Sequence, residues 1–189
     1  MTTITIKTAI LKAALVCAST EQARYYLNGV YVDPKGFLVS TDGHRAFVGR
    51  IDLTDVAPFD GWILPRDAIK RALAGYKADM IEIAPDRIGD ISCRSVDGSF
   101  PDWRRVVPTE LSGELAQFNP AYVADMGKIG EILNGRGKPV LPAQMHHNGE
   151  GPAGVTFAAD PDAFAVLMPI RATYADPASA WAERRAMID

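Results

Sequence analysis

The chain has 189 residues, of which 48% are hydrophobic and 23% charged, a composition typical of a globular protein that buries a core without cross-links. Its net charge of −3 excludes a protein that coats nucleic acid with its whole surface, but it allows a single basic face. The N-terminus lacks a basic-then-apolar leader, and no run reaches the ~18 apolar residues of a membrane span, so we expect a cytoplasmic protein. Cys17 and Cys93 have no metal-ligand spacing, and we expect both thiols to be reduced.

A helix and three strands are expected in the first third of the chain. Apolar residues recur every three or four positions over Ile6–Cys17, which predicts a helix. Runs rich in β-branched and aromatic residues predict strands over Tyr25–Val32, Phe37–Thr41 and Arg45–Ile51. The Asp-Pro-Lys-Gly sequence between the first two is a turn, because proline fixes φ and glycine accepts a positive φ.

A similar order of elements recurs in the middle of the chain. The short apolar run Trp62–Leu64 precedes a helix predicted over Pro65–Lys77, whose first residue lacks an N–H that a first helical turn does not need. Strands are predicted over Met80–Ala84, Ile91–Val96 and Phe100–Val107.

A third group of elements starts near residue 113. Leu115–Phe118 is predicted to be a strand, and it precedes a helix over Pro120–Asn134 that has an Asn-Pro start and a glycine after its end. Strands are predicted over Val140–His146, Val155–Ala158 and Ala163–Met168, and an Asn-Gly pair predicts the hairpin before the second of them.

These elements make three β-α-β-β-β units about 55 residues apart, beginning near residues 1, 60 and 113. We therefore expect an α+β fold with internal repetition. The alternative is an ordinary α+β domain in which helices and strands happen to alternate. Residues 172–189 form a tail with a short helix around Ala178–Met187.

Positive charge concentrates in the helical segments. Residues 7–24, 65–77 and 120–138 hold ten basic and four acidic residues, whereas the rest of the chain holds ten basic and 19 acidic residues. If the helices lie side by side, their polar faces form a basic floor suited to phosphate backbones rather than to base edges. The alternative is a set of solvated faces on which Lys and Arg are simply good helix formers.

The second helix shows this bias most clearly. Arg66, Lys70 and Lys77 fall within a sector of about 40° that lies away from its apolar face. The residues expected to face DNA are Lys7, Lys12, Arg66, Lys70, Arg71, Lys77, Lys128, Arg136 and Lys138.

Several ungapped motifs occur in a fixed order. Arg24–Val30 (RYYLNGV), Leu38–Ala46 (LVSTDGHRA), Ile63–Arg66 (ILPR) and Gly98–Pro108 (GSFPDWRRVVP) are found in the first part of the chain. In order and spacing they resemble the middle domain of the bacterial DNA polymerase III beta subunit, the sliding clamp. Two later motifs, FNPAY from Phe118 and FAVLMPIR from Phe164, resemble the second half of its last domain.

The resemblance implies the DNA clamp fold, in which each domain is a pair of β-α-β-β-β units. Helices line the hole of a ring, and antiparallel sheets form its outside. By this resemblance, residues 1–108 are a clamp domain, 109–171 are half of another and 172–189 are a tail. The family chain has six units and this one shows three, so we expect self-association into a dimer or tetramer, with third units paired about a two-fold axis.

The function implied by the resemblance is that of a non-enzymatic processivity factor of DNA replication. Such a homo-oligomer encircles double-stranded DNA without reading its sequence. It tethers a polymerase through a short peptide, and a clamp loader binds through a peptide of the same kind. The expected location is the cytoplasm, at the nucleoid, with no cofactor and no metal. The alternative is a clamp-derived protein that forms no ring and competes for clamp-binding peptides.

In the family, polymerase and loader peptides bind an apolar pocket between the middle and last domains. By motif match, its walls here are Arg24, Leu27, Thr41, Gly43, His44, Arg45, Ala46, Pro65, Asn119, Tyr122, Val166, Leu167, Met168, Pro169, Ile170 and Arg171. Ala46 replaces a larger aliphatic residue, and Pro120 and Ala121 also depart from the family pattern. The tail follows where the family chain stops, and it is expected to cover this pocket, to occupy it through Tyr174 or Trp181, or to lie elsewhere.

Two histidine-containing sequences are not expected to form catalytic or metal sites. The Asp42–Arg45 turn pairs an acid with His44, but no Ser or Cys has a spacing that would complete a nucleophilic site. His146 and His147 are adjacent on a predicted strand, so their side chains point to opposite faces and chelate poorly.

Overall fold

The computed structural model describes residues 2–171 and 177–187. Its first unit consists of β1 (Ile4–Lys7), α1 (Thr8–Cys17), β2 (Gly29–Asp33), β3 (Phe37–Thr41) and β4 (Arg45–Arg50). The β-α-β-β-β order predicted from the sequence is therefore present. The structure differs over Tyr25–Leu27, which form a short 3₁₀ turn ahead of β2 rather than the beginning of a strand.

The second unit consists of β5 (Trp62–Pro65), α2 (Arg66–Leu73), β6 (Met80–Ala84), β7 (Arg87–Ile88) and β8 (Ile91–Ser92). The helix begins one residue later than predicted and ends at Leu73, four residues before the predicted end, and Gly75 then takes a positive φ of 75°. Lys77 therefore does not lie on the helical face that it was expected to share with Arg66 and Lys70.

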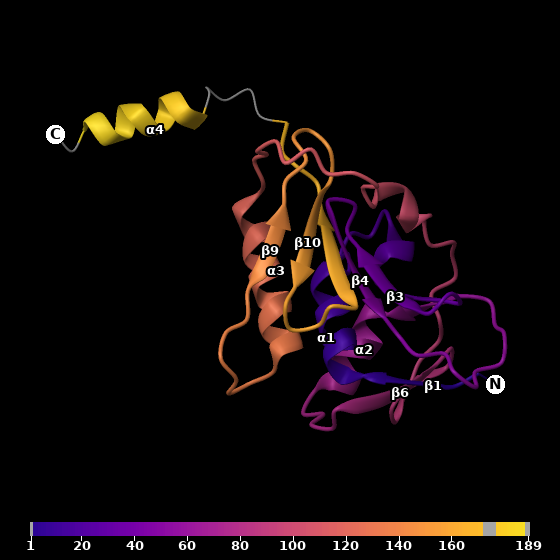
Figure 1. The fold of residues 1–189 in the computed structure, drawn as a ribbon. Coiled ribbons are helices and arrows are strands. Elements are labelled where there is room, and N and C mark those ends of the chain that lie inside the picture. The colour runs from indigo at the N-terminus through magenta and orange to yellow at the C-terminus, as the bar shows by residue number, and fades with distance from the viewer. Residues whose placement is uncertain (1, 172–176, 188–189) are drawn as a thin grey trace.

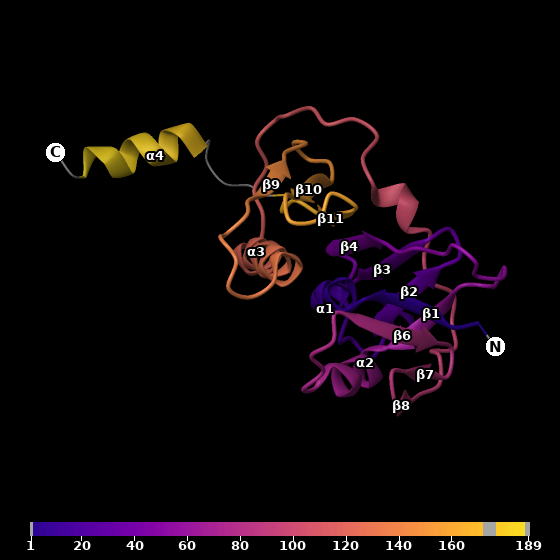
Figure 2. The same ribbon diagram turned by 60° about the horizontal axis from the view of Figure 1, so that its bottom comes forward.

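The third unit consists of α3 (Pro120–Asn134), β9 (Ala143–His146), β10 (Ala153–Phe157) and β11 (Ala163–Leu167). The expected cap is present, since the side-chain oxygen of Asn119 accepts a hydrogen bond from the amide of Ala121 at 3.0 Å. The strand predicted over Leu115–Phe118 is absent. A last helix, α4 (Pro177–Ala186), stands apart from the body of the fold in both views (Figures 1 and 2).

The strand predicted over Phe100–Val107 is wrong, and packing explains why. Trp103–Val106 form a short 3₁₀ helix, and the Phe100 ring stacks on that of Tyr31 with 5.0 Å between centroids. The segment lies against the outer surface of β3 and β4, where Trp103 packs with Val39 and Val48. It contacts the sheet through side chains rather than through backbone hydrogen bonds. Alternation of residue types alone does not distinguish such a segment from a paired strand.

The strands form two antiparallel sheets. One has the order β1-β6-β7-β8, and the other has the order β5-β2-β3-β4-β11-β10-β9. The larger sheet continues from the first unit into the third through the pairing of β4 with β11, in which Ala46 lies opposite Val166. Figure 2 shows the strands of both sheets along an arc, with α3, α1 and α2 next to one another on its concave side.

The first strand of each of the first two units lies in the sheet of the other unit. β1 pairs with β6, and β5 pairs with β2. Each unit therefore closes the sheet edge of its neighbour, and the two cannot separate without exposing both edges. The principal core lies between α1 and the sheets, with Ile10, Leu11 and Phe47 fully buried. No helix among the described residues is long and apolar enough to cross a membrane.

Asp33 fastens the outer segment to the sheet. Its carboxylate is almost fully buried and accepts hydrogen bonds from the Trp103 indole at 2.9 Å, the Arg104 guanidinium at 2.8 Å and the Lys35 amide at 2.8 Å. Burial by itself raises the pKa of Asp33, but these hydrogen bonds outweigh it and hold the pKa below its ordinary value. Asp33 is therefore a charged anchor inside the fold.

We predict that Asp33→Asn lowers the free energy of unfolding by about 1–3 kcal/mol at neutral pH, because hydrogen bonds to a charged acceptor are lost. Since the folded pKa lies below the unfolded value, this difference is present above about pH 4 and disappears as the pH falls through the folded pKa. Urea unfolding of both proteins across this pH range measures the effect. The exposed Asp60, changed to Asn, is the control, and an equal loss in both variants would contradict the prediction.

Candidate nucleic-acid interface and partner pocket

A basic groove runs between the three helices on the concave side of the arc. Its volume is about 540 Å³, and residues from α1, α2 and α3 all line it. The cations in its lining are Lys12, Arg66, Lys70 and Lys128, and the apolar residues are Leu15, Val16, Leu73, Ala74 and Ile132. Residues from three separate parts of the sequence thus place positive charge on one surface.

The groove lining also includes one acidic residue. Asp125 on α3 forms an ion pair with Arg45, which comes from β4. The negative charge of Asp125 is therefore offset by a cation outside the groove lining. Lys70 and Lys128 are exposed on the groove, so that the surface presented to solvent is positive.

The other cations expected to face DNA lie elsewhere. Lys7 forms an ion pair with Asp160 at 3.2 Å, and Arg71 is close enough to Cys93 to influence its pKa. Lys77 follows the end of α2, and Arg136 and Lys138 line a separate hollow beyond α3. The groove therefore contains four of the nine residues. Of the other five, only Lys77 is displaced because its helix is shorter than the sequence pattern indicated.

An apolar pocket lies at the junction of β4 and β11. It has a volume of about 280 Å³. Of the residues expected to form a peptide pocket, those in its lining are Arg24, Leu27, Thr41, Gly43, Arg45, Ala46, Val166 and Met168. Along β4, Phe47 packs into the core beneath α1 and Val48 packs against Trp103, so successive side chains serve opposite faces of the sheet.

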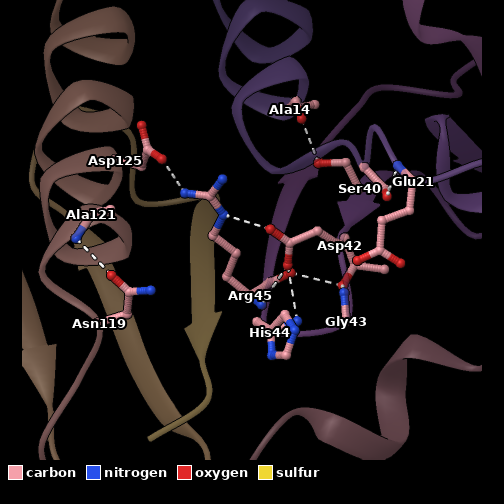
Figure 3. A network of polar contacts seen from close by, with 12 residues as sticks. Ala14, Glu21, Ser40, Asp42, Gly43, His44, Arg45, Asn119, Ala121 and Asp125 are labelled. Carbon is pink, nitrogen blue, oxygen red and sulfur yellow. Dashed lines mark hydrogen bonds and ion pairs between the residues drawn. The ribbon is translucent and has the colours of Figure 1, made fainter. Parts of the chain in front are cut away.

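The turn between β3 and β4 gives one wall of the pocket its shape. The Asp42 carboxylate accepts hydrogen bonds from the backbone amides of His44 at 2.9 Å and Arg45 at 3.1 Å (Figure 3). Gly43 has a φ of 91°, and a Cβ atom there would meet only the end of the flexible Arg24 side chain. The backbone conformation is therefore what favours glycine at this position.

Arg45 connects this turn to α3. Its Nε donates to Asp42 at 3.0 Å, and its guanidinium pairs with Asp125 (Figure 3). The same guanidinium lies 4.5 Å from the centroid of the Tyr122 ring. Burial lowers the pKa of Arg45, but the hydrogen bond that Arg45 donates to Asp125 and the charges of the surrounding carboxylates more than compensate, so its pKa is raised overall. The His44 ring also stacks on Tyr122, at 5.9 Å between centroids.

The remaining residues expected in the pocket lie around or away from it. Pro65 ends β5 opposite Gly29, Leu167 is buried in β11, and Asn119 caps α3. Ile170 and Arg171 line a different hollow, together with Glu114 and neighbouring residues. His44, Tyr122 and Pro169 do not line the pocket itself, and Tyr174 lies outside the described residues.

The pocket also has walls that the sequence pattern did not indicate. They are Tyr26, Pro101, Asp102, Trp103 and Val106. Four of these belong to the Gly98–Pro108 motif, whose residues are conspicuous in the sequence but were assigned to a strand. None of the described residues of α4 lines the pocket, and Trp181 is 70% exposed.

Neither the histidines nor the cysteines add a further site. The His146 ring lies 2.9 Å from the Thr156 hydroxyl, and the His147 ring accepts a hydrogen bond from the amide of Ala116. Within residues 2–171 and 177–187, no group of three or more His, Cys, Asp or Glu side chains is placed to hold a metal ion. Burial raises the pKa of the Cys17 thiol to about 12, so this thiol remains protonated inside the core.

Comparison with known proteins identifies consistent relatives. The chain is 30% identical to the beta sliding clamp of Caulobacter vibrioides over 133 residues, which are 60% of this chain and 36% of that protein. It is 36% identical to the beta sliding clamp of Salmonella typhimurium over 101 residues, 47% of this chain and 28% of that one. The chain thus spans about a third of the length of the curated relatives it matches. No protein-family model matches it.

Solved structures share its fold. The beta sliding clamp of Caulobacter crescentus superposes on 90% of this chain and 65% of its own, with a TM-score of 0.63 and 23% identity. The beta subunit of DNA polymerase III from Thermotoga maritima covers 92% of this chain and 66% of its own, with a TM-score of 0.66 and 15% identity. The resemblance to beta sliding clamps is therefore confirmed, and the chain has the sliding-clamp fold.

We predict that Arg45→Met lowers the free energy of unfolding by about 1–3 kcal/mol, because Asp42 and Asp125 both lose their cationic partner in a partly buried position. Denaturant unfolding measures the loss. Arg50→Met is the matched control, since Arg50 ends the same strand and is exposed. If the two substitutions cost the same, Arg45 does not hold α3 to the turn.

Proposed function

We propose that this chain, which resembles the beta sliding clamps in sequence and in fold, is a sliding-clamp-like processivity factor of DNA replication. Its helical face would bind the phosphate backbone of duplex DNA without reading sequence. The same molecule would hold a polymerase or another replication or repair protein through a short peptide in the apolar pocket. It would act by binding rather than by catalysis, in the cytoplasm at the nucleoid.

The observation that supports this proposal best is the basic groove. Three helices from three repeated units present Lys12, Lys70 and Lys128 together on the concave side of one arc of strands. A surface of this kind contacts phosphates, which are the same for every base pair, so it can move along the duplex. The acidic remainder of the chain keeps other faces from competing for DNA.

The described residues of one copy do not close around DNA. They form an open arc, as Figure 2 shows, and no strand of residues 2–171 pairs with the outer edge of β9. We therefore include homo-oligomerisation, as a dimer or a tetramer, in the proposal. A ring retained on DNA by topology rather than affinity raises the local concentration of whatever it tethers.

The pocket supports the tethering part of the proposal. It lies on the opposite face of the sheet from the helices, because alternate residues of β4 point to the two faces. A bound peptide would therefore not compete with DNA for the same surface. A polymerase could be held outside while the helices contact the duplex.

We predict that the double variant Lys70→Glu/Lys128→Glu binds duplex DNA more weakly and that its salt dependence is reduced. If each lysine contacts one phosphate, the slope of log affinity against log salt falls by about 2. Fluorescence anisotropy with duplexes of unrelated sequence measures both quantities. Lys35→Glu makes the same charge change in the turn between β2 and β3, away from the helices, and should leave the slope unchanged.

Topology distinguishes a ring from a simple basic surface. Retention on nicked circular DNA but not on the same DNA made linear is expected for a closed ring. Equal loss from both would contradict encirclement, and it would favour a protein that forms no ring and competes for clamp-binding peptides instead. An unchanged salt slope in the double variant would contradict the basic groove as the DNA contact.

We predict that Met168→Lys lowers the affinity for a clamp-binding peptide of a replicative polymerase at least tenfold, because it places a charge in an apolar pocket. Ile170→Lys is the matched control, since Ile170 is similarly exposed and lines another hollow. Titration of a labelled peptide measures both. Equal losses in the two variants would show that the pocket described here is not the peptide site.

A further inference from the structure

The hollow beyond α3, which Arg136 and Lys138 line at one end, is a largely apolar groove between α3 and the outer edge of β9. It has a volume of about 690 Å³ and reaches the buried residues Met126 and Val155. Val140 beside it is 89% exposed, and Val123 on α3 is 40% exposed. β9 is the last strand of its sheet, and no strand of residues 2–171 pairs with its outer edge. The core of the third unit is therefore open on this side.

The first two units show how an edge of this kind is closed. β5 covers β2 and β1 covers β6, and each covering strand ends at the residue directly before a helix. The side chain two residues before each helix points into the core. These side chains are Ile6, opposite Ile81, and Leu64, opposite Val30, and all four are buried.

The third unit contains a segment at the same position, but it covers no sheet edge in this structure. Phe118 lies two residues before α3, as Ile6 and Leu64 do before their helices, yet Leu115–Phe118 form no strand. Leu115 is 81% exposed. The segment instead lies against its own chain. The Gln117 carbonyl accepts a hydrogen bond from the Ile170 amide at 2.8 Å, the Ala116 amide donates to the His147 ring at 3.1 Å, and the centroids of the Phe118 and His147 rings lie 5.5 Å apart. Pairing with a second copy would replace these contacts.

We propose that segment Leu115–Phe118 of a second copy of this chain pairs with β9, and that the first copy reciprocates. In the observed exchange the covering strand always comes from another unit, and the first two units already cover each other. The third unit therefore needs a partner with an apolar strand directly before a helix, which another third unit supplies. A two-fold axis closes both edges at once. This inference specifies the homo-oligomer of the proposed function but does not depend on DNA binding.

Burial determines the register of this pairing. Met145 lies opposite the buried Val155, and both line the groove, so Met145 and Ala143 face the core. Placing Phe118 opposite Ala143 and Ala116 opposite Met145 puts all four on the inner face. Gln117 then lies opposite Gln144 on the outer face. A slip of one residue would turn Phe118 into solvent, so this register is strongly preferred.

The pairing is tested by cross-linking the double variant Gln117→Cys/Gln144→Cys. Residues directly opposite in antiparallel strands have Cβ atoms about 4.5–5.5 Å apart, within reach of a disulfide after small adjustments. Oxidation should give a covalent dimer on non-reducing gels that disappears with reductant. Both glutamines are exposed, so the substitutions leave the core unchanged.

The control places the second cysteine one strand further away. Thr156 lies opposite Gln144 on β10, so Gln117→Cys/Thr156→Cys has the same number of exposed cysteines but no pair within reach. The unmodified chain measures any background from Cys17 and Cys93. Absence of the dimer in the first variant, or equal dimer in the control, would overturn the proposal.

A second measurement uses the unmodified chain. Sedimentation equilibrium should show a dimer, and Val140→Glu should weaken it at least tenfold. Leu111→Glu, which makes the same change at another exposed apolar residue outside the groove, should not. A monomer at every concentration would overturn the proposal. Lys70→Glu/Lys128→Glu should remain dimeric, so loss of DNA binding and loss of pairing are separate outcomes. Failure of the proposed function is therefore distinguishable from failure of this inference.

Discussion

The pairing of β4 with β11 is the interaction on which the other features depend. It continues one sheet from the first unit into the third and so brings α3 beside α1. Without it, Lys128 would not share a groove with Lys12 and Lys70, and Val166 would not face Ala46 in the pocket. Both candidate sites therefore lie on opposite faces of one junction between segments more than a hundred residues apart.

Arg45 connects the two sides of that junction through ion pairs. It pairs backbone to backbone opposite Leu167, while its side chain reaches Asp125 on α3 and Asp42 in the turn. The junction thus combines the apolar contact between Ala46 and Val166, which has no preferred direction, with the ion pairs of Arg45, which do. The ionic contact sets the orientation of α3 relative to β4, and α3 provides the third side of the basic groove.

Strand exchange is the second organising principle. It binds the first two units together, because neither has a complete sheet without the other. The third unit has no covering strand within residues 2–171, with an open groove beside β9 and a segment before α3 that forms no strand. This open edge is a physical reason for the proposed self-association, independent of any ligand.

Local patterns were sufficient for elements whose own residues decide their structure. The helix start at Asn119-Pro120, the strands Phe37–Thr41 and Met80–Ala84, and the turn that ends at Gly36 are of this kind, and motif order was sufficient for the resemblance. Patterns failed for Phe100–Val107, because the Trp103 side chain packs on the sheet and the backbone of this segment does not pair with it. They also failed for Leu115–Phe118, because a strand requires a neighbouring strand that one copy does not provide.

The sequence by itself determined the repeated units, most of their helices and strands, and the excess of positive charge in the helical segments. Only the tertiary structure decided which four of the nine expected cations share a groove, and that Pro101 and Val106 rather than Pro65 line the pocket. The physical reason is that composition and periodicity report which face of an element is apolar, whereas the position of that face depends on pairings between segments distant in the chain.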